Sequence, residues 1–133
     1  MLEGKNILIA GAGVSGVGAA KLLGRAGFDA AIYDGNEQLD TEAVISQMPE
    51  GMQLKFELGE YKESLADQYD MLILSPGISV NSPIASSFYN KGKIVWGEIE
   101  LASHFAKGRI AAITGTNGKT TTTALVGSIL KSW

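Results

Sequence analysis

The stretch ILIAGAGVSGVGAAKLLGRAGFDAAIYD, residues 7–34, decides the fold. It opens with a four-residue apolar run, continues through GAGVSG at residues 11–16, and ends in a second apolar run at residues 30–33. In the pattern G-x-G-x-x-G, the first glycine allows a tight turn and the second lets a ligand approach the backbone. The third lets the following helix pack against the strand. The stretch therefore predicts a strand, a glycine-rich loop, a helix and a second strand parallel to the first.

Apolar runs that alternate with helical segments extend this unit along the chain. Beyond Ile7–Ala10 and Ala30–Tyr33, we predict strands at Leu54–Leu58, Met71–Leu74, Ile94–Trp96 and Ile110–Ile113. We predict helices over residues 14–26, 41–48, 61–67, 82–91, 97–106 and 120–131. Runs that are apolar throughout indicate strands buried on both faces, whereas LKFEL (54–58) alternates and suits a half-exposed edge strand.

These elements predict an α/β fold. We expect a Rossmann-like, doubly wound parallel sheet of about five strands in the order 3-2-1-4-5, with helices on both faces. The segment AKGR (106–109) is the best candidate for a domain boundary, because a sixth strand and a threonine-rich loop follow it. We therefore expect one domain over 1–107 and the start of a second over 108–133, made of a strand, a P-loop and a helix.

Composition excludes several classes of function. The 133 residues carry a net charge of −3, so no basic field exists to hold nucleic acid. The absence of cysteine excludes a disulfide framework, thiol catalysis and cysteine-ligated metals. No apolar run approaches the ~20 residues that a membrane-spanning helix needs, and the N-terminus does not have the pattern of a signal peptide. We expect a cytoplasmic protein without a nucleic-acid partner or a membrane segment.

The residues alone leave the ligand of the first loop open. Free N–H groups at a helix N-terminus favour an anion, and Asp34, at the end of the second strand, could accept from ribose hydroxyls. The loop SPG (75–77) follows the fourth strand, which neighbours the first in this topology, so the two loops should face each other. NAD, another nucleotide or a sugar nucleotide would fit, and the glycines could also serve only the turn.

The loop GTNGKTT, residues 115–121, is an incomplete match to a P-loop. The pattern G-x-x-x-x-G-K-[ST] ends in Gly118-Lys119-Thr120, but its first glycine would fall at position 113, which is isoleucine. Backbone N–H groups would hold the phosphates, Lys119 would reach the terminal ones, and the Thr120 hydroxyl would bind Mg²⁺. The alternative is a helix N-terminus with threonine caps and a solvated lysine. A nicotinamide dehydrogenase has no use for a P-loop, so the combination of the two loops is the strongest clue in the sequence.

The two loops in this order resemble the Mur ligases of bacterial cell-wall synthesis. ITGTNGKTTTT (113–123) is similar to the ATP loop of that family, which accounts for the shifted glycine. The stretch 7–34, SPGI followed by NSP, and GEIELA (97–102) resemble the D-glutamate-adding branch. The resemblance implies a bacterial, cytoplasmic ligase of peptidoglycan synthesis that uses ATP and Mg²⁺ and no NAD. It would join D-glutamate to UDP-N-acetylmuramoyl-L-alanine through an acyl phosphate.

The resemblance also implies which residues bind which ligand. Those that would contact the uridine diphosphate moiety are Gly13, Val14, Ser15, Gly16, Asp34, Gly35, Asn36, Ser75, Pro76 and Gly77. Those that would contact ATP are Gly115, Thr116, Asn117, Gly118, Lys119, Thr120 and Thr121, with Thr120 also on Mg²⁺. Some relatives have an arginine where this chain has GNE (35–37), so a guanidinium that stacks on uracil is not available here. The acids, the histidine and the carbamylated lysine of the central domain, and the D-glutamate site, would lie outside these residues. We thus expect no complete catalytic site and no ligation by this chain alone.

Two other functions fit parts of the sequence. GAGVSG and Asp34 favour a nicotinamide-dinucleotide-binding domain of an oxidoreductase, and a nucleotide sensor that is complete as it stands would use both loops. We further expect the strand 110–113 and the apolar face of the last helix to fold back on the first domain or to pair with a second copy, giving a homodimer through residues 108–133. Glu98 and Glu100 do not share a helix face, so we expect a solvated helix start there.

Overall fold

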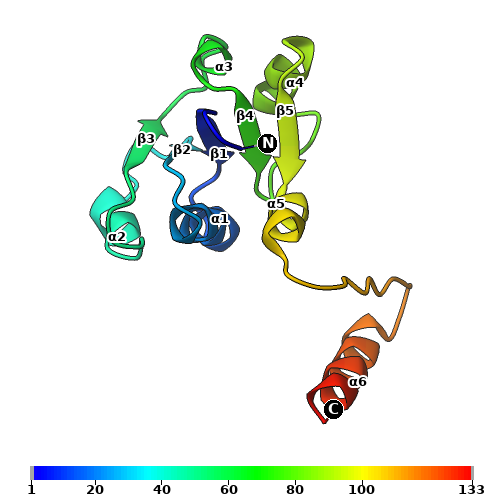
Figure 1. Ribbon diagram of the computed structural model, residues 1–133. Coiled ribbons are helices and arrows are strands. Elements are labelled where there is room, and N and C mark those ends of the chain that lie inside the picture. Colours follow the sequence, from blue (N-terminus) through cyan, green and yellow to red (C-terminus); the bar gives the residue numbers. More distant parts are fainter. Residues whose placement is uncertain (1, 133) are drawn as a thin grey trace.

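The fold is built on a five-stranded parallel sheet, seen in a computed structural model that describes residues 2–132 (Figure 1). The strand order is β3-β2-β1-β4-β5, which confirms the predicted order and the α/β class. The two central strands, β1 (Ile7–Ala10) and β4 (Met71–Leu74), are buried at every position. They pair directly, with Ile7 opposite Met71 and Ala10 opposite Leu74. Because both faces of these strands lie against helices, their sequences are apolar throughout.

The outer strands are less buried. On one side lie β2 (Ala30–Asp34) and then β3 (Leu54–Leu58), and on the other lies β5 (Ile94–Gly97). No residue of β3 is fully buried and Lys55 is exposed, which confirms the prediction that LKFEL forms an edge strand. Each outer strand ends at the same edge of the sheet as β1 and β4, because all pairs are parallel.

Helices cover both faces of the sheet, as predicted. One face packs against α1 (Val14–Arg25), α2 (Thr41–Ile45) and α5 (Glu98–Phe105), with Leu23 and Leu101 fully buried. The other face packs against α3 (Leu65–Gln68) and α4 (Pro83–Asn90), where Phe88 is fully buried. The helix expected over 61–67 begins only at Leu65, since residues 62–67 form successive i→i+3 turn hydrogen bonds instead.

The prediction of a strand at Ile110–Ile113 is wrong. These residues have no regular structure, and Ile110 is 65% exposed. Among residues 2–132 no strand pairs with this segment, and a single strand without a ladder partner gains no hydrogen bonds from extending. The expected strand–P-loop–helix unit is therefore reduced to a loop and a helix, α6 (Lys119–Lys131).

Helix α6 lies apart from the sheet. Figure 1 shows it at the red end of the chain, connected by an extended segment to α5. None of its residues is buried, and Leu125, Ile129 and Leu130 are 58–69% exposed. The expectation that this segment folds back on the first domain is therefore wrong for this structure. Among the described residues, no helix is long and apolar enough to cross a membrane.

Candidate functional site

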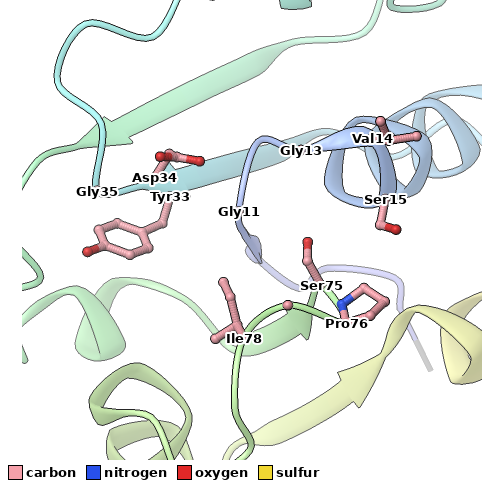
Figure 2. A pocket seen from close by; sticks show the side chains of 11 residues that line it. Gly11, Gly13, Val14, Ser15, Tyr33, Asp34, Gly35, Ser75, Pro76 and Ile78 are labelled. Carbon is pink, nitrogen blue, oxygen red and sulfur yellow. The ribbon is translucent and has the colours of Figure 1, made fainter.

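The loops that follow β1, β2 and β4 enclose a cavity of about 490 Å³ at the carboxyl edge of the sheet (Figure 2). This is the crevice in which open α/β sheets bind ligands, at the point where the strand order reverses. Most of the residues that the sequence analysis predicted for the uridine diphosphate moiety line this cavity. The predicted residues that line it are Gly13, Val14, Ser15, Asp34, Gly35, Ser75, Pro76 and Gly77. Gly16 and Asn36, which were also predicted, do not line it, whereas Gly11, Tyr33 and Ile78 line it in addition.

Two glycines make the first loop possible. Gly11 has φ +94°, a left-handed conformation that disfavours other residues, and its N–H donates to the carbonyl of Tyr33 at 2.7 Å. A Cβ on Gly16 would lie 1.8 Å from the carbonyl oxygen of Gly11. Helix α1 can therefore begin directly above β1 only because position 16 has no side chain.

The N-terminus of α1 opens into the cavity. Gly13 is the N-cap residue, no side chain caps the helix there, and no atom lies within 4 Å of the point where a Cβ would stand. Val14 is 95% exposed, so the first turn is accessible to a ligand. The first N–H groups of a helix lack intrahelical partners and carry a partial positive charge, which favours an anion. The arrangement suits a phosphate group that approaches over Gly13.

Asp34 ties the first two loops together. Its Oδ2 accepts from the N–H of Ala12 at 2.8 Å, and its Oδ1 accepts from the N–H of Asn36 at 2.9 Å. Asn36 thus shapes the site through its backbone. Each carboxylate oxygen has a further lone pair, so Asp34 can still accept from a ligand hydroxyl or N–H group. This bracing role was not predicted from the sequence, since only the fold brings residues 12 and 34 together.

Tyr33 is a lining residue that sequence reasoning missed. Its hydroxyl donates to the carbonyl of Gly59 at 3.1 Å, and its ring packs edge-on against Tyr61 with ring centroids 5.7 Å apart. Burial, and then the negative charge of Asp34, raise the pKa of the Tyr33 phenol. Figure 2 shows the ring beside Gly35, below the Asp34 carboxylate. Tyr33 belongs to no motif in the sequence. Its position just before Asp34, as an aromatic residue near the end of a strand, is the signal that could have identified it.

The loop 75–78 forms the opposite wall of the cavity. It leaves β4 through a turn in which the N–H of Ile78 donates to the carbonyl of Ser75 at 2.9 Å. The Ser75 Oγ is buried beside Gly11 and Gly16, and it has no hydrogen-bond partner among residues 2–132. Gly77 has no atom within 4 Å of where its Cβ would stand. A ligand can therefore approach its backbone closely.

The residues of the second loop lie in the C-terminal segment, which Figure 1 shows apart from the sheet, and none of them lines this cavity. Gly118, with φ +79°, precedes α6 as its N-cap, and Thr120 and Thr121 follow in the exposed first turn. The Lys119 Nζ donates to the carbonyl of Gly115 at 2.5 Å, so the loop closes on itself. Thr116 and Asn117 lie within that closed loop. Among residues 2–132, no group of three or more His, Asp or Glu residues could hold a metal ion.

Fold and cavity together define a Rossmann-like domain with a cavity at the carboxyl edge of its parallel sheet. The chain belongs to the family of the Mur ligase MurD-like N-terminal domain, whose model matches residues 5–97. It is 47% identical over 132 residues to a UDP-N-acetylmuramoylalanine–D-glutamate ligase of Lachnospira eligens, covering 99% of this chain and 29% of the relative. The ligase of the same name from Lachnoclostridium phytofermentans is 40% identical over 130 residues, covering 98% of this chain and 29% of the relative.

A solved structure agrees with these relatives. The pseudomurein peptide ligase type C from Methanothermus fervidus superposes with a TM-score of 0.55 at 26% identity, covering 96% of this chain and 26% of that one. The chain spans about 29% of the length of the curated relatives. All three of these relatives are ligases by name.

Proposed function

We propose that this chain acts as the N-terminal part of an ATP-dependent ligase of peptidoglycan synthesis, one that adds D-glutamate to UDP-N-acetylmuramoyl-L-alanine. Residues 1–107 form the domain that binds the uridine diphosphate moiety, and residues 108–133 are the start of an ATP-binding domain. The observation that carries the proposal is the cavity at the carboxyl edge, where the α1 N-terminus, Asp34 and the 75–78 loop converge. The 47% identity to a ligase with that substrate in its name supports the choice of ligand.

The cavity offers complementary chemistry to each part of uridine diphosphate. The free N–H groups in the first turn of α1, which follows Gly13, suit the phosphates. The open space at Gly77 allows the phosphates to approach the backbone closely. The spare lone pairs of Asp34 suit the N–H group of a pyrimidine or a ribose hydroxyl. With Gly35 beside it, this end of the cavity has room for a planar base.

Residues Gly115–Thr121 would serve ATP in the complete enzyme. Lys119 would exchange the carbonyl of Gly115 for a phosphate oxygen, and Thr120 would present its hydroxyl to Mg²⁺. Bound Mg²⁺ would offset the negative charge of the phosphates during carboxylate activation. The carboxylates, histidine and lysine that the ligation needs lie beyond these residues in our proposal, so the chain alone forms no product.

Ligand titration by thermal shift tests the proposal. UDP and UDP-N-acetylmuramoyl-L-alanine should raise the melting temperature by mass action, whereas NADH should not. ATP with Mg²⁺ should change the melting temperature little, because residues 115–121 form only part of an ATP site. Protection by NADH without any response to UDP would instead favour the oxidoreductase domain, and tight stoichiometric ATP binding would favour the nucleotide sensor. Product formation in a turnover assay with ATP, D-glutamate and the muramoyl substrate would refute the prediction that this chain alone is inactive.

We also propose that residues 108–133 mediate a homodimer in a cytoplasmic setting. The support is the exposed apolar face of α6, where Leu125, Ile129 and Leu130 have no covering residues among those described. Light scattering on the chain and on a variant without residues 108–133 tests this idea. A dimer that persists after the deletion would rule out this segment as the interface.

A further inference from the structure

A separate cavity lies at the opposite edge of the sheet, where the strands begin. This amino-edge cavity measures about 560 Å³, which is within the usual range of small-molecule sites. It is lined by residues 4–7 at the start of β1, residues 27–31 at the start of β2, part of β3 and the end of α3. No residue lines both this cavity and the one at the carboxyl edge. A ligand bound here would therefore occupy a second, independent site.

Small residues keep the amino-edge cavity open. Ala31 of β2 stands opposite Lys55 of β3, on the face of the sheet that α3 and α4 cover, and its methyl group fills little of the space there. Gly27, with φ +82°, turns the chain from α1 toward β2, and no atom lies within 4 Å of the point where its Cβ would stand. The hollow thus lies between the face of the sheet and the loops that precede its strands.

Two carboxylates of this cavity are held in place, and each has one oxygen to spare. The Oε1 atom of Glu57 accepts from the hydroxyl of Tyr69 at 2.9 Å, and Tyr69 is only 8% exposed. The Oδ1 atom of Asp29 accepts from the backbone N–H of Gln53 at 2.8 Å. The second oxygen of each carboxylate accepts no hydrogen bond from residues 2–132. Because an ionised carboxylate can only accept, both groups suit a donor such as an ammonium group.

Two lysines bring positive charge to the same cavity. Lys5 is half-buried and Lys55 is exposed, and both line the hollow. The ion pair found among residues 2–132 joins Lys91 to Asp67, so neither lysine of the cavity is paired with a carboxylate there. Two positive and two negative groups offer no overall attraction to a ligand that is purely anionic or purely cationic. The described residues also include no group of three His, Asp or Glu that could hold a metal ion.

A zwitterion matches this arrangement of charges. Its ammonium group donates to the positioned carboxylates of Asp29 and Glu57, and its carboxylate accepts from a lysine ammonium group. The side-chain amides of Gln53 and Gln68, which both donate and accept, also line the cavity and suit a neutral polar group. We infer that the amino-edge cavity binds a free α-amino acid with a neutral polar side chain. This inference does not depend on the proposed function, because the two cavities share no lining residue.

Three matched ligands test both ends of the zwitterion. L-Glutamine carries both charges, L-glutamine amide keeps only the ammonium group, and N-acetyl-L-glutamine keeps only the carboxylate. Each is titrated into the full chain while backbone amide shifts are followed by NMR. L-Glutamine should shift the amides of Gly4, Gly27 and Gln53 and leave those of Gly13 and Gly77 in place. Because the cavity is open to water, we expect a dissociation constant on the order of 1 mM. Each analogue should bind at least about fivefold more weakly.

Two variants test the charged groups of the cavity one at a time. Glu57→Gln removes the charge but keeps an oxygen for Tyr69, and Lys55→Gln changes an exposed side chain, so both should fold. Each should weaken binding of L-glutamine about threefold to tenfold. Glu60→Gln and Lys62→Gln are the matched controls, because both side chains change the charge equally and lie on none of the cavities. The controls should alter the affinity less than twofold, and amide dispersion checks that every variant is folded.

Several results would overturn the inference. They are no shift at ten times the expected dissociation constant, equal binding of all three ligands, and shifts confined to the loops at the carboxyl edge. Equal weakening by the control variants would reduce the effect to overall charge and would also refute a site. UDP binding is measured separately at the other edge of the sheet, so its outcome neither rescues nor removes this inference.

Discussion

Replacing Gly16 by alanine should disrupt the junction between β1 and α1. The added Cβ would lie 1.8 Å from the carbonyl oxygen of Gly11, 2.9 Å from its carbonyl carbon and 3.2 Å from the Ser75 Oγ. The two closest atoms are backbone, so no side-chain rotation relieves the contact. Overpacked cores typically lose ~1–3 kcal/mol, and because the backbone itself must move we expect Gly16→Ala to lose at least about 3 kcal/mol. For a domain of this size, that corresponds to a fall in melting temperature of roughly 12–24 °C.

Gly18→Ala is the matched control within the same helix. Gly18 is exposed and has no atom within 4 Å of its Cβ position, so alanine meets no contact there. Alanine in a helix interior is favoured over glycine by about 1 kcal/mol, so this variant should melt roughly 4–8 °C higher. The assay is thermal unfolding followed by circular dichroism, without ligand. Equal melting temperatures for the two variants would refute the steric argument for Gly16.

Three further outcomes follow from the contacts of the site and the sheet. Gly13→Ala should leave the melting temperature within a few degrees, because its Cβ position is open, yet lower UDP affinity in calorimetric titration by crowding the phosphates. Asp34→Ala removes both braces, to Ala12 and Asn36, and should destabilise the chain by about 1–3 kcal/mol in urea unfolding. Burial and a hydrogen bond to Glu57 raise the pKa of Tyr69 above its ordinary 10.0, so the folded state keeps a proton that the unfolded state loses. Stability should therefore fall as the pH rises above 10, and less steeply in Tyr69→Phe.

The sheet was predictable because its signals are local and consistent. Fully apolar runs at residues 7–10 and 71–74 marked the buried centre, and the alternating LKFEL marked the edge. Each run is short and bounded by turn residues, so the period of the pattern and the length of the run agree. The glycine spacing then fixed where the first helix begins, and topology rules left few strand orders to choose between.

The strand at 110–113 was mispredicted because strand formation is not a local property. IAAI has the composition of a buried strand, but an extended segment becomes a strand only when a neighbour supplies its hydrogen bonds. Neither edge strand of the sheet, β3 or β5, pairs with residues 110–113. Tyr33 and Ile78 were missed for a related reason, since both line the cavity only through the packing of distant loops.

The two loops of the chain differ in what fixes their shape. In the first, Gly11 bonds to the carbonyl of Tyr33, and Asp34 holds Ala12, so the sheet itself determines where the loop lies. In the second, the main fixed contact is from Lys119 to Gly115, four residues away within the same exposed segment. A preorganised site binds with a smaller loss of conformational entropy than one that a ligand must order. Moreover, the Lys119 ammonium must leave its carbonyl partner before it can reach a phosphate. These two differences are the physical reason to expect binding of uridine diphosphate by this chain to be stronger than its binding of ATP.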